Sequence, residues 1–254
     1  MKTTFYFLAI AFLTLLVSCK EDTNLVEVKI PEPEVKVSHE FSNPNDYKAT
    51  GKPFKLYALP FRFDSISQPI GGKNLEYHYA KVYLNYANKL NTLIEEKQWT
   101  DKTITQICTE VKAEDVALKN NAGGFYNHTL YFEILTPKLN TQPSDTLKTA
   151  LVDTFGSVAN FKTSFTKTAL SSFGSNWVWL LVTKNKKLEI VTTTNENNPL
   201  MVDATSKGKP LIALDVWEHA YLNNYQNNKK EYIDCFLKHL NWDLISERYQ
   251  NLIE

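Results

Sequence analysis

Apolar residues recur every three or four positions over residues 74–96, and this spacing predicts an amphipathic helix. The stripe is formed by Val82, Tyr86, Leu90, Leu93 and Ile94. His78 lies at the start of the same stripe. Two shorter helices are predicted at residues 103–112 and 127–135, and the second ends before a proline that cannot continue it. The segment 51–138 is therefore expected to form a helical domain.

The pattern changes in the second half of the chain. Serine and aspartate residues are placed to cap helices, and alternating apolar residues on both sides of a polar turn predict a hairpin. The elements expected are a helix from residue 144 or 145 to about 155, a helix at 157–174, the hairpin at 176–194, a strand at 210–216, and helices at 218–226, 229–240 and the C-terminus. An N-terminal helical hairpin domain, followed by a domain over residues 139–254 with a three-stranded antiparallel sheet wrapped by helices, is an α+β fold.

The N-terminus has the pattern of an export signal. Lys2 precedes an unbroken apolar run that is too short to span a bilayer, so residues 1–18 are expected to be a signal peptide. "LVSC" resembles the lipobox of bacterial lipoproteins, in which the cysteine, here Cys19, becomes the lipidated first residue. Residues 19–50 are charged and rich in proline, which favours an extended tether. The expected product is an exported lipoprotein of the outer membrane or cell surface, with a periplasmic position or a plain secretory signal as alternatives.

The charge balance of the chain bears on which binding partners it can have. The chain has 28 basic and 28 acidic residues, so its charge gives no case for nucleic acid or for an anionic surface, and membrane contact is expected only through the N-terminal lipid. A small substrate is favoured instead. Cys108 and Cys235 lie far apart, each inside a helical pattern, and we expect both to be buried free thiols, with a disulfide as the alternative.

The candidate chemistry centres on histidines. Asp215 and His219 stand four residues apart, a spacing that puts two side chains on one face of a helix, where an ordinary ion pair is the alternative to a metal site. The chain has five histidines, and those outside the tether and the late helix are His78, His128 and His219. Taken singly, each of these histidines is better explained as a hydrogen-bonded core residue, but the three taken together are not. Three imidazoles with a carboxylate together suit manganese, iron or zinc.

Four segments occur in the order found in the iron and manganese superoxide dismutases, and the chain resembles that family over about residues 53–250. The segments are "LEYHYAK", "NNAGGFYNH", "FGSNWVWL" and "LDVWEHAY". The resemblance implies a two-domain subunit with one manganese or iron ion between the domains. It also implies that superoxide is converted to dioxygen and hydrogen peroxide by a homodimer. The ligands implied are His78, His128, Asp215 and His219.

The resemblance also implies roles around the metal. Trp177 and Trp217 are expected to form the aromatic wall of the site, and Glu218 to reach the metal-binding histidine of the partner subunit. Tyr86 is expected to be the gateway tyrosine, with Tyr83 as the alternative if a gap in the first helix is placed earlier.

Two positions depart from the family pattern. Manganese-type members have a glutamine where this chain has Glu196, and iron-type members have one where it has Gly124, so the metal stays open between manganese and iron. We hypothesise that Glu196 imitates the amide when protonated and accepts a hydrogen bond when ionised. Because both glutamines are missing, the alternative functions are a surface lipoprotein that binds the metal with little turnover, and an enzyme that uses the metal on peroxide.

Overall fold

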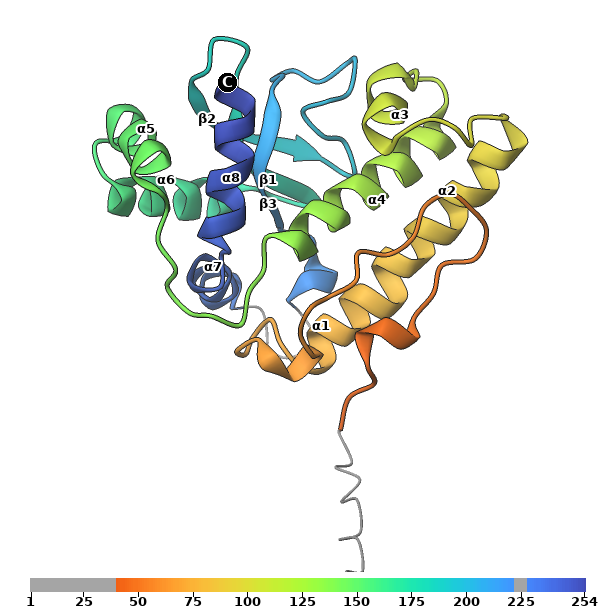
Figure 1. The fold of residues 1–254 in the computed structure, drawn as a ribbon, viewed down its shortest axis with the longest axis horizontal. Helices are drawn as coiled ribbons and strands as arrows, with labels where there is room; N and C mark the ends of the chain where they lie inside the picture. Colours follow the sequence, from red (N-terminus) through yellow and green to blue (C-terminus); the bar gives the residue numbers. More distant parts are fainter. Residues whose placement is uncertain (1–39, 222–227) are drawn as a thin grey trace, which may run out of the picture. The chain divides into compact units, whose positions relative to one another are not determined.

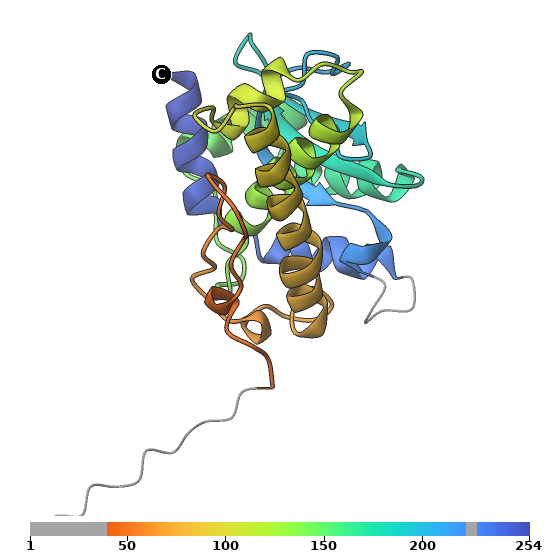
Figure 2. The ribbon, with the colours of Figure 1, turned by 90° about the vertical axis from the view of Figure 1, so that its right-hand side faces the viewer.

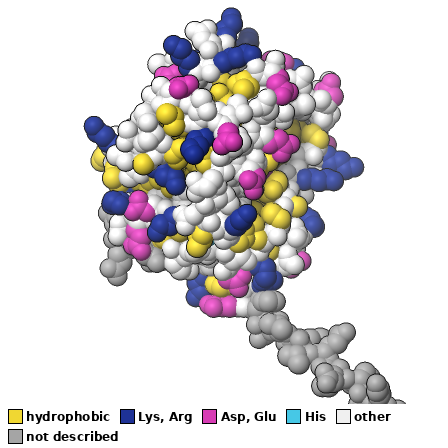
Figure 3. All heavy atoms as spheres, turned by 60° about the vertical axis from the view of Figure 1, so that its left-hand side comes forward, with side chains coloured by type: hydrophobic (Ala, Val, Ile, Leu, Met, Phe, Trp, Pro, Cys, Tyr) yellow, Lys and Arg dark blue, Asp and Glu magenta, His cyan; other side chains and the backbone are white. Residues whose placement is uncertain are grey.

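The computed structural model describes residues 40–221 and 228–254, so the predicted signal peptide and Cys19 lie outside the described residues. Among the described helices, none is long and apolar enough to cross a membrane. Basic and acidic side chains are interspersed over the face shown in Figure 3, in line with the balanced composition.

The first half of the chain forms a helical hairpin, as predicted. Its elements are α1 (Lys73–Tyr77), a π-helical segment (His78–Tyr83), α2 (Leu84–Glu96), α3 (Ile104–Glu110) and α4 (Val116–Glu133). The first three form one continuous rod that packs against α4 (Figure 1). Thr103 begins α3 with a capping box, and the carboxylate of Asp115 accepts the backbone N–H of Leu118 to begin α4.

The helix α4 begins earlier than the sequence predicted. It starts at Val116 and not at residue 127, because Asp115 caps it and Leu118 in its first turn is buried in the core. Gly123 and Gly124 made this part of the helix hard to predict from the sequence, because glycine is a poor helix former. Here the two glycines are buried where α4 approaches other segments closely, and packing outweighs their low propensity.

The second half contains the sheet. Its elements are α5 (Asp145–Phe155), α6 (Val158–Ser171), β1 (Asn176–Val182), β2 (Leu188–Thr194), β3 (Lys209–Asp215), a 3-10 turn (Glu218–Ala220), α7 (Lys229–Lys238) and α8 (Trp242–Ile253). The three strands are antiparallel in the order β2-β1-β3, which confirms the predicted sheet. Both α4 and α8 pack on β3, while α6 packs on β1 and β2. The central strand β1 is buried along its whole length.

The segment before α1 lies against the helical hairpin. Residues 41–50, predicted as the end of the tether, hydrogen-bond to the helices and do not extend away from them. Asn91 of α2 donates to the carbonyl oxygens of Thr50 and Phe54 at 2.8 and 2.9 Å, and Thr50 N donates to Asn88 at 2.7 Å. Figures 1 and 2 show this segment running beside α2. The folded part of the chain therefore begins before residue 50.

The helix predicted at residues 218–226 is wrong in its described part. Only a 3-10 turn, Glu218–Ala220, is present, and residues 222–227 lie outside the described residues. Asp215 is the last residue of β3, and its Oδ1 accepts the backbone N–H of Trp217 at 2.8 Å, which makes a tight turn in place of a helix start. Cys108 and Cys235 are buried free thiols, as predicted.

Candidate metal centre

The predicted ligands from four separate segments meet at one point. His78 begins the π-helical segment, His128 lies in α4, Asp215 ends β3 and His219 lies in the 3-10 turn. One ligand atom from each of these side chains lies within 4.8 Å of all the others. Since α4 packs on both α2 and β3, the cluster lies between the helical hairpin and the sheet.

The three imidazoles converge on one carboxylate oxygen. Oδ2 of Asp215 lies 3.0 Å from Nε2 of His219, 3.2 Å from Nε2 of His78 and 3.6 Å from Nε2 of His128. The Nε2 atoms of His78 and His128 are buried and make no hydrogen bond. Polar atoms left without a partner in a protein interior cost free energy, and a metal ion supplies the missing partner. The residues therefore fit a bound metal.

The tautomer of His128 favours metal binding. Its Nδ1 lies 2.6 Å from the carbonyl oxygen of Gly124, which can only accept, so Nδ1 carries the proton. The lone pair is then on Nε2, the atom that faces the cluster. A backbone carbonyl that orients a metal-binding histidine in this way also raises its basicity.

The charges of the four groups suit a metal cation. Burial lowers the pKa values of His78 and His128, so both imidazoles are neutral near pH 7. Burial alone would raise the pKa of Asp215, but His219 and His78 lower it further than burial raises it, and the carboxylate is ionised. For His219, burial lowers the pKa and the charge of Asp215 raises it, with a net increase. Imidazole nitrogens with one carboxylate oxygen are ligands for iron, manganese or zinc.

Asp215 is held from both sides. In the antiparallel register it lies opposite Trp177 of β1, and its backbone carbonyl accepts the hydroxyl of Tyr232 at 2.8 Å. The carboxylate is fully buried, with Oδ1 bound to the backbone of the following turn and Oδ2 directed to the histidines. The strand end thus fixes which oxygen faces the cluster.

Next to the cluster, the side chain of Glu196 makes three hydrogen bonds. Its Oε1 accepts the hydroxyl of Tyr86 at 3.0 Å, and its Oε2 accepts Nδ2 of Asn127 and Nε1 of Trp177, each at 3.0 Å. Glu196 is 1 % exposed, and burial together with the charge of Asp215 raises its pKa to about 8. Its carboxyl group is therefore mostly protonated at neutral pH in this structure.

The two candidate tyrosines take different places. Tyr86 lies with its ring 5.2 Å from that of His128 and its hydroxyl on Glu196. The hydroxyl of Tyr83 instead hydrogen-bonds Thr129 at 2.7 Å and accepts the backbone N–H of Tyr57, away from Glu196. Of the two, Tyr86 is the one joined to the polar network beside the cluster.

Two glycines of α4 allow this approach. A Cβ atom at Gly124 would lie 2.5 Å from the ring of Tyr86, and one at Gly123 would lie 2.0 Å from the backbone oxygen of Glu196. A side chain at Gly124, such as the glutamine of iron-type members, would require Tyr86 to move. Asn127 was not among the predicted site residues, although its place directly before His128 was a signal, because its hydrogen bond to Glu196 joins residues 69 positions apart.

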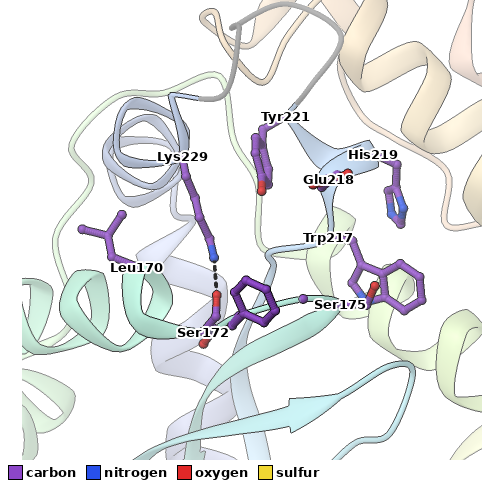
Figure 4. A pocket seen from close by; sticks show the side chains of 10 residues that line it. Leu170, Ser172, Ser175, Trp217, Glu218, His219, Tyr221 and Lys229 are labelled. Atoms are coloured by element: carbon purple, nitrogen blue, oxygen red, sulfur yellow. Dashed lines mark hydrogen bonds between the residues drawn. The ribbon is translucent and has the colours of Figure 1, made fainter.

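The two tryptophans differ in exposure. Trp177 is fully buried with its ring 5.1 Å from that of His128. Trp217 is partly exposed, lies 5.5 Å from the ring of His219 and lines a cavity of about 500 Å³. Figure 4 shows Trp217, Glu218 and His219 on one side of this cavity and Lys229 on the other, where its ammonium group donates to the carbonyl of Ser172 at 2.8 Å. The cavity gives solvent a route to His219.

Comparisons with known proteins agree on one family. Residues 53–136 match the family model described as "Iron/manganese superoxide dismutases, alpha-hairpin domain". Residues 143–248 match the model for the C-terminal domain of the same family. The chain is 39 % identical over 203 residues to the superoxide dismutase [Mn] of Acinetobacter baylyi, covering 79 % of this chain and 89 % of the relative. It is 38 % identical over 194 residues to the superoxide dismutase [Fe] of Salmonella typhimurium, and 37 % identical to that of Escherichia coli, covering 76 % of this chain and 97 % of each relative.

Proposed function

Because this chain belongs to the iron/manganese superoxide dismutase family, we propose that it converts superoxide and protons to dioxygen and hydrogen peroxide at the His78, His128, Asp215 and His219 cluster. The observation that carries the proposal is the convergence of three imidazole Nε2 atoms on one buried carboxylate oxygen, with two of these nitrogens lacking any hydrogen bond. Relatives named for manganese and for iron match equally well, so we propose that the cofactor is one ion of either metal.

Bound there, manganese or iron would supply the one-electron oxidation of one superoxide ion to dioxygen and the one-electron reduction of a second, which takes up two protons, to hydrogen peroxide. The chain's own residues set the charge around the bound metal and the access of water to it. The ionised Asp215 offsets part of the cation's charge, while the neutral His78 and His128 add none. Trp177 packs against His128 and keeps bulk water from that side.

Tyr86 and Glu196 are the proposed proton holders. The hydroxyl of Tyr86 lies 3.0 Å from Oε1 of Glu196, and burial raises the pKa of each group, so both hold protons at neutral pH before a metal binds. Because Oε2 already accepts from Nδ2 of Asn127 and Nε1 of Trp177, which can only donate, the acidic proton of protonated Glu196 is on Oε1 and is donated to the hydroxyl of Tyr86. Protonated Glu196 then presents one acceptor and one donor, as a glutamine amide does, which supports the role of amide mimic.

The test is superoxide decay in solution. A soluble form should begin at residue 40, because residues 41–50 hydrogen-bond to the helices. The form would be loaded in parallel with manganese and with iron, and decay measured at equal metal content. Fast decay with one metal and not the other supports the dismutase and identifies the cofactor, whereas fast decay with both supports an enzyme that accepts either metal. If both forms retain stoichiometric metal and neither speeds decay, the dismutase proposal is wrong, and the metal-binding lipoprotein becomes the better reading. Glu196→Gln is then the first substitution to test for restored decay.

We also propose that the protein is exported and anchored through a lipid at Cys19, which is supported by the sequence pattern of residues 1–19 alone. Several acyl chains on one cysteine would bind a membrane firmly. In a bacterial host, the wild-type protein should sediment with membranes and carry an N-terminal lipid detectable by mass spectrometry. Cys19→Ser should release it from the membrane fraction, and an unmodified N-terminus in the wild type would contradict the proposal.

A homodimer is proposed at the mouth of the cavity. Phe173 is 98 % exposed there and lines the same cavity as Glu218, whose side chain is also exposed. A large apolar side chain in this position is favourable when a second copy covers it. Glu218 is placed next to His219, so in a symmetric pair each Glu218 could reach the partner's His219. Sedimentation of the metal-loaded protein would show the dimer.

A further inference from the structure

His239, which the ligand cluster does not use, joins three segments that are distant in the sequence. It follows the last residue of α7 and is 1 % exposed. Its Nε2 accepts the backbone N–H of Ser67 at 3.1 Å, and its Nδ1 lies 2.7 Å from the carbonyl oxygen of Thr136. Ser67 precedes α1, and Thr136 follows α4, so one imidazole connects α7 to both ends of the helical hairpin (Figure 1).

These contacts require the neutral imidazole. The carbonyl of Thr136 can only accept, so Nδ1 carries a proton, and the N–H of Ser67 can only donate, so Nε2 must offer its lone pair. A second proton on Nε2 would face the N–H of Ser67 and break that hydrogen bond. Burial lowers the pKa of His239 below its ordinary value of 6.5, and the charge of Lys238 lowers it as well, although the bond to Thr136 opposes this. The neutral form is thus the one that the fold stabilises.

The loop held by His239 leads directly to the ligand cluster. The carbonyl of Ser67 accepts the N–H of Gly71 at 3.0 Å, just before α1 begins. The side-chain amide of Asn74 in α1 donates to Pro69 of the loop at 3.3 Å and to the carbonyl of Ala220 at 2.5 Å. Ala220 is the neighbour of His219, and α1 continues into the segment that begins with His78. The loop is therefore bonded to the elements that carry two of the four proposed ligands.

We propose that His239 is a positioning residue for the metal centre: its neutral imidazole holds the loop of residues 67–71 in place, and its protonation releases that loop and loosens the hold on the metal. The inference rests on the proposed metal site. Its effect on the loop, however, can be measured without metal, which separates it from the dismutase activity.

The charged groups around His239 do not offset its protonation. Lys238, the adjacent residue, disfavours a positive imidazole. Cys235 lies one turn earlier in α7, and its thiol donates to the carbonyl of Ser67 at 3.4 Å, so it adds no charge. Three carboxylates on the neighbouring segments are paired with their own cations; these pairs are Asp64 with Arg62, Glu133 with Arg248, and Asp234 with Lys230. Glu231, about two turns earlier in α7, accepts from the side-chain amide of Asn228.

The direction of the pH effect follows from the lowered pKa. At pH values between 6.5 and the lower pKa of His239 in the folded chain, the unfolded chain binds a proton at His239 and the folded chain does not. The contribution of His239 to stability is therefore complete above 6.5 and decreases as the pH falls toward the folded-state pKa. Release of the loop should begin in that range.

Two substitutions separate the two hydrogen bonds. In His239→Gln the amide oxygen can take the place of Nε2 and accept from Ser67 without titrating. In His239→Asn the amide can reach Thr136 only, so the bond to Ser67 is lost at every pH. Hydrogen exchange of the peptide containing Gly71 and Asn74, corrected for the intrinsic effect of pH, reports the loop. Release of Mn²⁺ to a chelator from the manganese-loaded protein reports the site.

We expect the wild type to show slow exchange and slow release at about pH 8 and to become roughly tenfold faster in both at about pH 5, the factor that loss of one hydrogen bond supplies. His239→Gln should stay slow in loop exchange at both pH values, and His239→Asn should be fast at both. Lys238→Gln should move the wild-type midpoint to higher pH. Identical pH responses of wild type and His239→Gln would overturn the proposal. A loop that opens without faster Mn²⁺ release would overturn the positioning role.

Discussion

Replacing Glu196 by glutamine should change how stability depends on pH. Glutamine can keep the three hydrogen bonds: its oxygen accepts from Asn127 and Trp177 in place of Oε2, and its amide donates to Tyr86, whose hydroxyl rotates to accept. The substitution therefore removes an ionisable group from a fully buried position and leaves the packing almost unchanged.

The magnitude follows from the pKa of Glu196. It is raised from 4.5 to about 8 in the folded chain. Between these values the unfolded chain is ionised at Glu196 while the folded chain keeps the proton, so stability falls as the pH rises through this range. One pKa unit corresponds to ~1.4 kcal/mol, and from pH ~5 to ~8 the wild type should lose about 3–4 kcal/mol more than Glu196→Gln.

The assay is urea unfolding of the metal-free protein at several pH values, because a bound cation would lower the pKa of Glu196. Groups other than Glu196 titrate in both proteins, so their contributions cancel in the difference between the two curves. Glu189→Gln, at an exposed position on β2, is the matched control and should run parallel to the wild type.

Two results would refute the reasoning. If the stability curves of wild type and Glu196→Gln are parallel from pH ~5 to ~8, Glu196 is not held protonated by burial. If Glu196→Gln is less stable at every pH, the carboxyl group makes a contact that the amide cannot replace. In either case the proposed amide mimicry would have to be abandoned.

Three further substitutions test the site and its surroundings. Gly123→Ala should destabilise the protein by about 2 kcal/mol in urea unfolding, because its Cβ would lie 2.0 Å from the backbone oxygen of Glu196; an unchanged midpoint would contradict this approach. Lys229→Gln should lower kcat/KM for superoxide roughly two- to tenfold and weaken its salt dependence, because the ammonium group lines the cavity that contains His219; equal salt dependence would exclude steering. Phe173→Asp should shift the sedimenting species from dimer to monomer, and an unchanged dimer would place the interface elsewhere.

Much of the fold could be predicted from local patterns. The apolar stripe of residues 74–96 and the alternation over 176–194 each depend on neighbouring residues, and a helical rod and a hairpin formed there as expected. The start of α4 could not be read because Gly123 and Gly124 lower helix propensity, while the packing that tolerates them involves distant segments.

Asp215 and His219 were correctly predicted to lie together, although the helix predicted between them is not present. Four residues fit one turn of helix, but the same separation also fits a strand end followed by a tight turn. Both geometries direct the two side chains to one place. The residues were therefore identifiable from the sequence, and the backbone between them was not.

The sequence by itself determined the types of residue available to a metal, their resemblance to one family, and the order of helices and strands, because these depend on residue identity and on short-range periodicity. The tertiary structure alone decided that Tyr86 and not Tyr83 meets Glu196, that burial raises the pKa of the Glu196 carboxyl group, and that His239 bonds Ser67. The physical reason is that hydrogen-bond partners and desolvation are set by residues far away in the chain, which no local pattern records.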